Sequence, residues 1–168
     1  KKISSAKQKN NVSPVMILTF NGKKIMFTGD CDDAEVNFRS TALKDGVENF
    51  DVDVLKVAHH GGKESTSEAF LDIVKPEYSV ISVAEKNTYG HPTPELLDRL
   101  DKVGSKVFTT KDKGDIVLTL QGDKMGWAFQ HADAGEDVIP DDGADVEEVA
   151  MLRKNLVASN CFERRYAV

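Results

Sequence analysis

Short apolar runs alternate with segments of helical periodicity along most of the chain. The dipeptide Asn21-Gly22 separates the first two apolar runs and predicts a β-hairpin. The strands that we expect span residues 15–20, 24–28, 52–58, 78–83, 106–109, 115–120 and 124–130. The expected helices span residues 33–44, 65–75, 94–103 and 145–158.

Two of the predicted helices have recognisable start signals. Ser65 is the expected N-cap of the helix over 65–75, with Glu68 three residues later in the capping-box position. Thr93 is the expected cap of the next helix, because Pro94 occupies the first helical position. The apolar stripe of that helix comprises Leu96, Leu97, Leu100 and Val103.

Chemically active side chains follow three of the predicted strands. Strand–helix–strand order implies parallel strands with right-handed crossovers, so the carboxyl ends of these strands meet at one edge of the sheet. Asp30, the pair His59 and His60, and the loop that carries His91 should therefore cluster at this edge. Aspartate and histidine are preferred ligands of zinc, so the pattern predicts a metal site there.

Alternative interpretations of these residues stay open. Asp30, Asp32 or Asp33 could each cap the helix that follows. Cys31 is either a soft metal ligand or an inert buried thiol, and the second is the more common role of a single cysteine beside a buried strand. His131 has no supporting residues around it and is interpreted as structural.

Composition and charge restrict the class of protein. The 168 residues are 40% hydrophobic and 30% charged, which fits one full globular domain with a tail. The net charge of -6 argues against general coating of nucleic acid, although a nuclease can meet phosphate through its metal ions. Two cysteines do not make a disulfide framework, so a cytoplasmic location is expected, with an extracellular one as the alternative. We expect neither a membrane segment nor a signal peptide in this chain.

Composition also divides the chain into segments. We expect a flexible N-terminus over residues 1–11, a folded domain over 12–131, an acidic linker over 132–143, and a C-terminal helix and tail over 144–168. Because the chain begins abruptly, it could also be a fragment of a longer protein.

Four segments together resemble the metallo-β-lactamase superfamily, and within it the metallo-hydrolase domain of the DNA-uptake channel proteins of bacterial competence. These segments are Phe27-Thr28-Gly29-Asp30, Leu55-Lys56-Val57-Ala58-His59-His60-Gly61-Gly62-Lys63, Val80-Ile81-Ser82-Val83 and Tyr89-Gly90-His91-Pro92-Thr93-Pro94-Glu95. The resemblance runs from about residue 10 to residue 120. It implies an αββα sandwich of two similar halves with a two-metal site, usually of zinc, with manganese as the alternative.

The resemblance also assigns roles to single residues. Asp30 would be the carboxylate that bridges both metal ions, and His60 would be a further metal ligand. His59 would be its neighbour or a substrate contact, and His91 would touch the substrate or donate a proton at the mouth of the site. Asn10 or Asn11 stands near the place where many relatives have one more histidine.

One family motif has no match in this chain. The principal metal motif, His-x-His-x-Asp-His, belongs to the first half of the family's domain. The chain is therefore expected to be an α/β structure equivalent to the second half of the sandwich, with a C-terminal helical tail. It would be a fragment, a subunit completed by another chain, or a degenerate member. One face of its sheet would need a partner, either the missing N-terminal half-domain or a second copy of the chain.

These features support three hypotheses about function. The first is part of a metal-dependent hydrolase that acts on phosphodiester or related ester bonds, with nucleic acid or another phosphoester as substrate; lactams, thioesters and lactones are less favoured. The second is a non-catalytic half-domain that serves as an assembly or binding subunit. The third is a phosphatase of the haloacid dehalogenase type, based on Asp30 and Asp32, but Ala34 stands where that family has threonine or valine.

Overall fold

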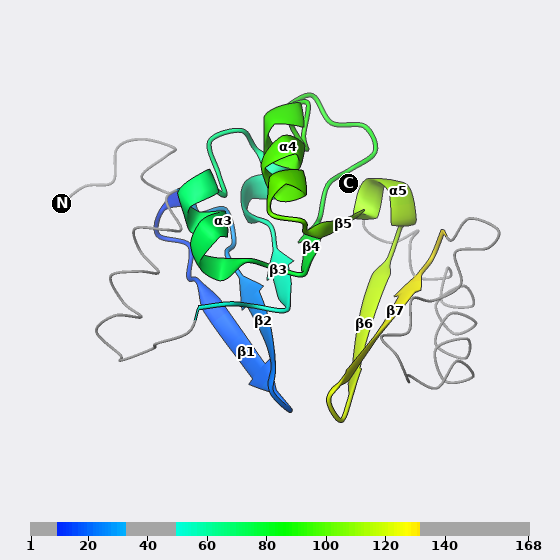
Figure 1. Ribbon diagram of the computed structural model, residues 1–168. Coiled ribbons are helices and arrows are strands. Elements are labelled where there is room, and N and C mark those ends of the chain that lie inside the picture. The colour runs from blue at the N-terminus through cyan, green and yellow to red at the C-terminus, as the bar shows by residue number, and fades with distance from the viewer. Residues whose placement is uncertain (1–9, 33–49, 132–168) are drawn as a thin grey trace. The chain divides into compact units, whose positions relative to one another are not determined.

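The computed structural model describes residues 10–32 and 50–131 and has a mixed α/β architecture (Figure 1). Its contacts group the chain into two compact units, residues 1–111 and 112–168, which are described separately. The first unit contains a five-stranded sheet in the order β1-β2-β3-β4-β5. Its elements are β1 Met16–Phe20, β2 Lys23–Phe27, β3 Val54–Lys56, η1 Ala58–Gly61, α3 Glu68–Val74, β4 Tyr78–Ile81, α4 Pro94–Lys102 and β5 Lys106–Thr109.

The predicted hairpin between the first two strands is confirmed. β1 pairs antiparallel with β2, and Phe20 lies opposite Lys23. The two loop residues both have positive φ angles, 48° at Asn21 and 82° at Gly22. Asparagine and glycine tolerate this backbone region better than other residues, which explains why the dipeptide predicts the turn.

The parallel arrangement of the remaining strands is also confirmed. β2, β3, β4 and β5 pair in parallel in that order, so their carboxyl ends lie at one edge of the sheet. The predicted helix over 33–44, which would join β2 to β3, lies outside the described residues. The sheet therefore presents the segments after β2, β3 and β4 at a common edge, as the sequence predicts.

Two helices cover one face of this sheet. Met26, Leu55 and Ile81 lie on that face, because residues that pair across neighbouring strands share a face. They form a buried cluster with side chains of α3 and α4, and Figure 1 shows both helices on the same side of the sheet. The helical members of this cluster are Phe70, Leu71, Val74, Leu96 and Leu100.

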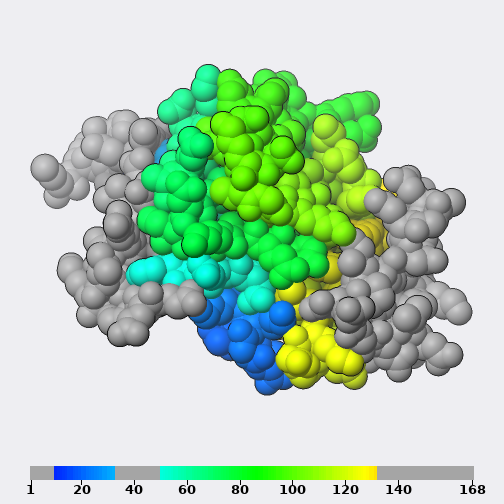
Figure 2. Space-filling view, viewed as in Figure 1, coloured from blue at the N-terminus to red at the C-terminus, as the bar shows by residue number. Residues whose placement is uncertain are grey.

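The other face carries apolar residues that are exposed along β1 and β2. Met16 pairs with Phe27 and Leu18 pairs with Ile25, which places them on the face away from the two helices. Met16, Leu18, Phe20 and Phe27 are 55%, 51%, 48% and 39% exposed, and we call them the apolar strip. Figure 2 shows the blue atoms of the hairpin at the surface, next to the cyan segment. Exposed apolar side chains in such a row are typical of a surface that another segment covers.

The second unit contributes a two-stranded antiparallel hairpin. β6 Ile116–Gln121 pairs with β7 Lys124–Phe129, and Gln121 lies opposite Lys124. Gly122 has a φ angle of 63° in the two-residue loop between the strands, a backbone region that glycine adopts readily. A short helix, α5 Thr110–Lys113, precedes the hairpin and was not expected from the sequence.

The structure corrects several predicted boundaries. The N-cap of α3 is Ser67, whose side chain accepts the Phe70 N–H, so the prediction that Ser65 caps this helix is wrong. Leu97 is 37% exposed and does not belong to the buried stripe of α4, which consists of Leu96 and Leu100. β3 and β4 are shorter than predicted and end at Lys56 and Ile81.

Some predictions fall on residues that the structure does not describe. These are most of the N-terminus over 1–11, the acidic linker over 132–143, and the helix and tail over 144–168. Within the two described ranges, no helix has the length and apolar content needed to cross a bilayer.

Candidate functional site

The candidate site is built from the segments that follow β2 and β3. Thr28, the residue directly after β2, is buried and donates its hydroxyl hydrogen to the Lys56 carbonyl at 2.7 Å. The His59 N–H donates to the Gly29 carbonyl at 3.0 Å. These two hydrogen bonds join the segments directly, and so they hold Asp30 beside the two histidines.

Gly29 permits the sharp exit of the chain before Asp30. Its φ angle is +54°, and a Cβ at this position would lie 2.9 Å from the Ser13 Cβ. The Ser13 hydroxyl accepts the Asp30 N–H at 3.3 Å. A larger residue at position 29 would push these two segments apart, so the position of Asp30 depends on this glycine.

Asp30 and His60 lie close together and face solvent. The Asp30 Oδ1 is 3.8 Å from the His60 Nε2, and the two side chains are 50% and 54% exposed. The His60 Nδ1 lies 2.8 Å from the Ser82 carbonyl, which can only accept a hydrogen. This contact requires the hydrogen on Nδ1, so in the neutral ring Nε2 carries a lone pair close to a carboxylate oxygen. Metal-binding histidines commonly have this arrangement, in which the distal ring nitrogen donates to a carbonyl.

The backbone of both histidines is left-handed. His59 has φ and ψ angles of 48° and 45°, and His60 has 54° and 20°. Histidine is one of the few non-glycine residues enriched in this region. The Gly62 N–H closes the turn by donating to the His59 carbonyl at 2.9 Å. Because the backbone turns in this way, both rings leave the end of β3 at the sheet edge.

The Ser65 side chain stabilises this turn through contacts with two of its backbone carbonyls. Its buried hydroxyl lies 3.1 Å from the Ala58 carbonyl and 2.9 Å from the Gly62 carbonyl. Arg99 of α4 adds hydrogen bonds from Nη2 to the Lys63 and Ser65 carbonyls, at 2.8 and 3.0 Å. The sequence predicts Ser65 as a helix cap, but its hydroxyl contacts the turn carbonyls and not the helix.

Gly61 provides the room for α4 to approach this turn. It has a φ angle of +83°, and a Cβ there would lie 2.7 Å from the Pro92 Cβ and 2.9 Å from the Leu96 Cδ2. The Gly61 carbonyl also accepts the Thr93 N–H at 3.0 Å. The start of α4 is thus packed directly on the turn that contains His59 and His60 (η1), which we call the histidine turn.

His59 forms a second, more enclosed pair with an aspartate. Its Nδ1 lies 2.9 Å from the Asp32 Oδ1, and the Asp32 side chain is only 7% exposed. Asn10 reaches the other carboxylate oxygen at 3.4 Å, and Asn11 Oδ1 accepts the Asp32 N–H at 3.0 Å. The carboxylate accepts the Nδ1 hydrogen and so leaves the His59 Nε2 free of that contact. The sequence suggested Asp32 as a possible helix cap or as part of a phosphatase motif with Asp30, and it did not indicate this role beside His59.

His91 completes the group of imidazoles. Its ring centroid is 5.8 Å from that of His59, and the His59 and His60 centroids are 6.3 Å apart. Burial, together with the nearby His59 and His60, lowers the pKa of His91 below its ordinary value of 6.5. His91 is therefore neutral near pH 7 and can donate a hydrogen bond from one ring nitrogen while it accepts at the other.

Lys56 lies near the site and was not singled out from the sequence. Burial lowers its pKa, while the negative charge of Asp30 acts in the opposite direction. Its Nζ donates to the Val57 carbonyl at 3.0 Å. The signal in the sequence was a lone cation inside the apolar run from Leu55 to Ala58. Lys56 can offset part of the negative charge around Asp30.

The described residues hold a partial set of metal donors. Asp30 and His60 are a pair of candidate ligands whose donor atoms lie close together and are accessible to solvent. Within residues 10–32 and 50–131, no group of three or more candidate ligands is present. Cys31 is fully buried, with its Sγ 4.0 Å from the Asn11 Oδ1, which favours the structural interpretation of this thiol. His131 lies in the second unit, where its N–H donates to the Lys113 carbonyl.

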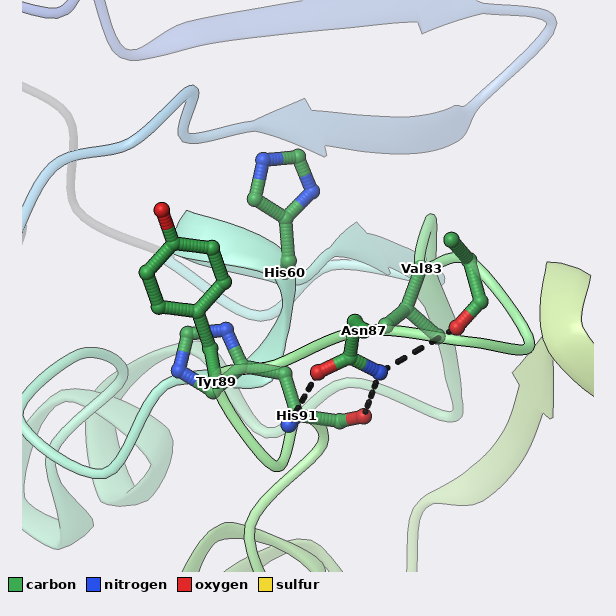
Figure 3. A pocket seen from close by; sticks show the side chains of 6 residues that line it. His60, Val83, Asn87, Tyr89 and His91 are labelled. Atoms are coloured by element: carbon green, nitrogen blue, oxygen red, sulfur yellow. Dashed lines mark hydrogen bonds between the residues drawn. The ribbon is translucent and has the colours of Figure 1, made fainter.

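A pocket of about 180 Å³ opens beside these histidines (Figure 3). It is lined by His60, Val83, Ala84, Asn87, Tyr89 and His91. Figure 3 shows the rings of Tyr89 and His91 next to each other, with the His60 ring standing apart from them. The pocket therefore borders both a candidate metal ligand and a candidate substrate contact.

Comparison with known proteins identifies homologues with names from bacterial competence and recombination. The chain is 33% identical over 108 residues to ComE operon protein 3 of Bacillus subtilis (strain 168). It is 32% identical over 118 residues to Recombination protein 2 of Haemophilus influenzae, and 35% identical over 111 residues to Competence protein ComA of Neisseria gonorrhoeae. No family model matches the chain.

These similarities cover most of the chain but little of the relatives. The matched segments make up 64%, 69% and 66% of this chain, and 13%, 14% and 16% of the three relatives. The chain is thus homologous to a small part of competence proteins at modest identity.

Proposed function

We propose that this chain contributes ligands to a metal-dependent phosphodiesterase site of the metallo-β-lactamase type, with nucleic acid as the substrate. The observation that carries the proposal is the open pair of Asp30 and His60, in which a carboxylate oxygen lies 3.8 Å from a ring nitrogen whose partner nitrogen contacts a carbonyl. Competence is the uptake of DNA by bacteria, and the names of two relatives therefore favour nucleic acid over other phosphoesters.

The donor atoms fit a zinc or manganese ion. Both metals accept carboxylate oxygen and imidazole nitrogen, and neither side chain has to leave a strong hydrogen bond to bind one. Asp30 and His60 would hold the ion. When bound, a divalent ion lowers the pKa of a water molecule and polarises the scissile phosphoryl group.

The remaining residues act on the substrate. Asp32 orients His59 through Nδ1, so that Nε2 can contact a phosphate oxygen or a water hydrogen. The neutral His91 can donate a hydrogen bond to the leaving oxygen. Lys56 lowers the net negative charge that an incoming phosphate meets near Asp30.

The site needs ligands from outside the described residues. Two donors are fewer than the three or four protein ligands of ordinary zinc sites. We propose that the missing donors come from an N-terminal half-domain or a second copy, which would also cover the apolar strip of β1 and β2.

Metal binding and hydrolysis test the proposal directly. We expect the chain, together with the half-domain or second copy that supplies the missing donors, to bind Zn²⁺ or Mn²⁺ and to cleave a short single-stranded oligonucleotide, and Asp30→Asn should remove both activities. Asp98→Asn is the matched control, because Asp98 forms an exposed ion pair with Lys102 on α4, away from the strand ends. Equal metal binding and equal cleavage in Asp30→Asn and the control would overturn the assignment.

An assembly or binding subunit is the second candidate function. The small number of donors and the apolar strip favour it. If the protein associates through the strip but takes up neither metal under any condition, this candidate replaces the first. Leu18→Lys would then abolish association, as measured by sedimentation.

A further inference from the structure

The pocket beside the candidate site has an exposed aromatic wall. Tyr89 is 81% exposed, the highest value among the large hydrophobic side chains of the described residues. Its ring centroid lies 5.8 Å from that of His91, with the two planes inclined by 31°. Figure 3 shows both rings on the same side of the pocket. An aromatic ring that remains exposed next to a reactive group is typical of a surface on which a ligand stacks.

The loop that carries Tyr89 is held firmly by one side chain. The Asn87 Nδ2 donates to the Ala84 and His91 carbonyls at 3.2 and 2.9 Å, and its Oδ1 accepts the His91 N–H at 2.9 Å. These bonds close the loop on itself, as the dashed lines in Figure 3 show. The ring of Tyr89 is therefore presented from a preorganised loop, which reduces the entropy lost when a ligand binds.

We propose that this pocket binds the base of the nucleotide next to the scissile phosphate, with the base stacked on Tyr89. The inference rests on the proposed function and adds a subsite to it. His60, a candidate metal ligand, lines the same pocket, so a phosphate held at the metal site would place its neighbouring nucleoside here. The remaining lining of Val83 and Ala84 is apolar, which suits the face of a heterocyclic ring.

The same geometry predicts weak sequence preference. The Asn87 amide is the one amide side chain in the pocket lining, and its oxygen and nitrogen already bond to the loop backbone. It is therefore not free to read the hydrogen-bonding edge of a base. Stacking alone accepts any base, because every base has a flat aromatic face. Single strands should bind better than duplexes, whose bases are already stacked on each other.

The test compares a short oligothymidylate with an abasic strand of the same length and charge. Binding to the 168-residue chain is measured by fluorescence anisotropy, and the Tyr89 ring signals are followed by NMR. We expect Tyr89→Ala to weaken binding of the oligothymidylate by about 5-fold to 100-fold, the range for loss of one stacked base. Binding of the abasic strand should not change. Tyr89→Phe should retain the wild-type affinity because it keeps the ring.

Leu97→Ala is the matched control, since Leu97 is a large hydrophobic residue of α4 that is 37% exposed and does not line the pocket. It should leave both affinities unchanged. The base subsite would be overturned if Tyr89→Ala lowered the affinity for both strands equally, or left the affinity for the oligothymidylate unchanged. If cleavage still depends on Asp30 in that case, the proposed function stands without the subsite. If the chain binds neither strand and the protein cleaves none, both fail together.

Discussion

Two aspartate–histidine pairs lie side by side at the strand ends, and they differ in nearly every physical respect. Asp32 and His59 are in hydrogen-bond contact at 2.9 Å, and the carboxylate is almost fully buried. Asp30 and His60 are 3.8 Å apart, and both are about half exposed. The same two segments of chain therefore contribute one closed pair and one open pair.

This difference indicates a division of roles. In the closed pair, the carboxylate is occupied by the ring that it orients, so it has little capacity for another ligand. In the open pair, the ring is oriented by a backbone carbonyl instead, and the carboxylate remains available. A side chain that binds a metal ion directly needs the open arrangement, while a residue that contacts substrate benefits from the closed arrangement.

The largest expected effect comes from removing a donor of the open pair. His60→Asn should weaken Zn²⁺ or Mn²⁺ binding by more than about 100-fold, beyond the 10-fold to 100-fold typical of a supporting residue. Asparagine tolerates the left-handed backbone at this position, so the fold should persist. Isothermal titration of each metal checks this prediction. His131→Asn is the control, and equal affinities of both variants would show that the open pair holds no ion.

Substitution in the closed pair should change the tautomer of the His59 ring, and not the metal affinity alone. Asp32→Asn offers an amide that can donate to Nδ1, so we expect His59 to change tautomer and cleavage to fall by about 10-fold or more. Long-range ¹⁵N NMR of the imidazoles measures the tautomer. The His60 signals are an internal control, because the Ser82 carbonyl can only accept. An unchanged His59 tautomer with full activity would contradict the orienting role.

A smaller effect is expected from the turn that both pairs share. Ser65→Ala removes the hydroxyl that contacts the Ala58 and Gly62 carbonyls, and the free energy of unfolding should fall by about 1–3 kcal/mol. Urea denaturation measures this change. Ser67→Ala, which removes the N-cap of α3, should cost about 1 kcal/mol without altering the histidine NMR signals. If Ser65→Ala also leaves those signals unchanged, the hydroxyl does not position the pairs.

The smallest effect is a dependence on pH through His91. Its pKa in the folded protein lies below the ordinary value of 6.5, so the unfolded chain binds this proton more readily. Stability should therefore decrease as the pH falls below about 6.5, until the folded-state pKa is passed, and be unaffected by this group above that range. Urea midpoints across this interval test the sign, and His91→Gln should reduce the slope.

The two pairs also bear on that titration. His59 and His60 contribute to the lowered pKa of His91, although burial is the larger cause. Replacing His59 with asparagine should therefore raise the His91 pKa toward its ordinary value, as followed by ¹H NMR. A His91 pKa at or above 6.5 in the unaltered protein would contradict the arrangement.

Much of the sheet could be predicted because its determinants are local. Asn21-Gly22 encodes a turn through its own backbone preferences, and apolar runs separated by helical periodicity imply parallel strands. The meeting of Asp30, His59 and His60 at one edge follows from that topology. These predictions needed no knowledge of how side chains pack.

The closed pair could not be predicted, because it depends on tertiary contacts and on the left-handed turn. The sequence singles out Asp30 through the Phe27-Thr28-Gly29-Asp30 segment, but nothing in it pairs Asp32, two residues later, with His59. The start of α3 was misplaced for a related reason. Ser65 and Ser67 are both good capping residues, and contacts with the histidine turn determine which of them is used.

The consecutive left-handed residues at positions 59 and 60 limit how this segment can change over evolutionary time. Valine, isoleucine or threonine would be strained there, whereas asparagine and glycine fit the backbone. Homologues that have lost the activity but retained the fold should therefore tend to have Asn or Gly at these two positions. The identity of the residues at positions 59 and 60 would then distinguish active homologues from inactive ones in any set of related genomes.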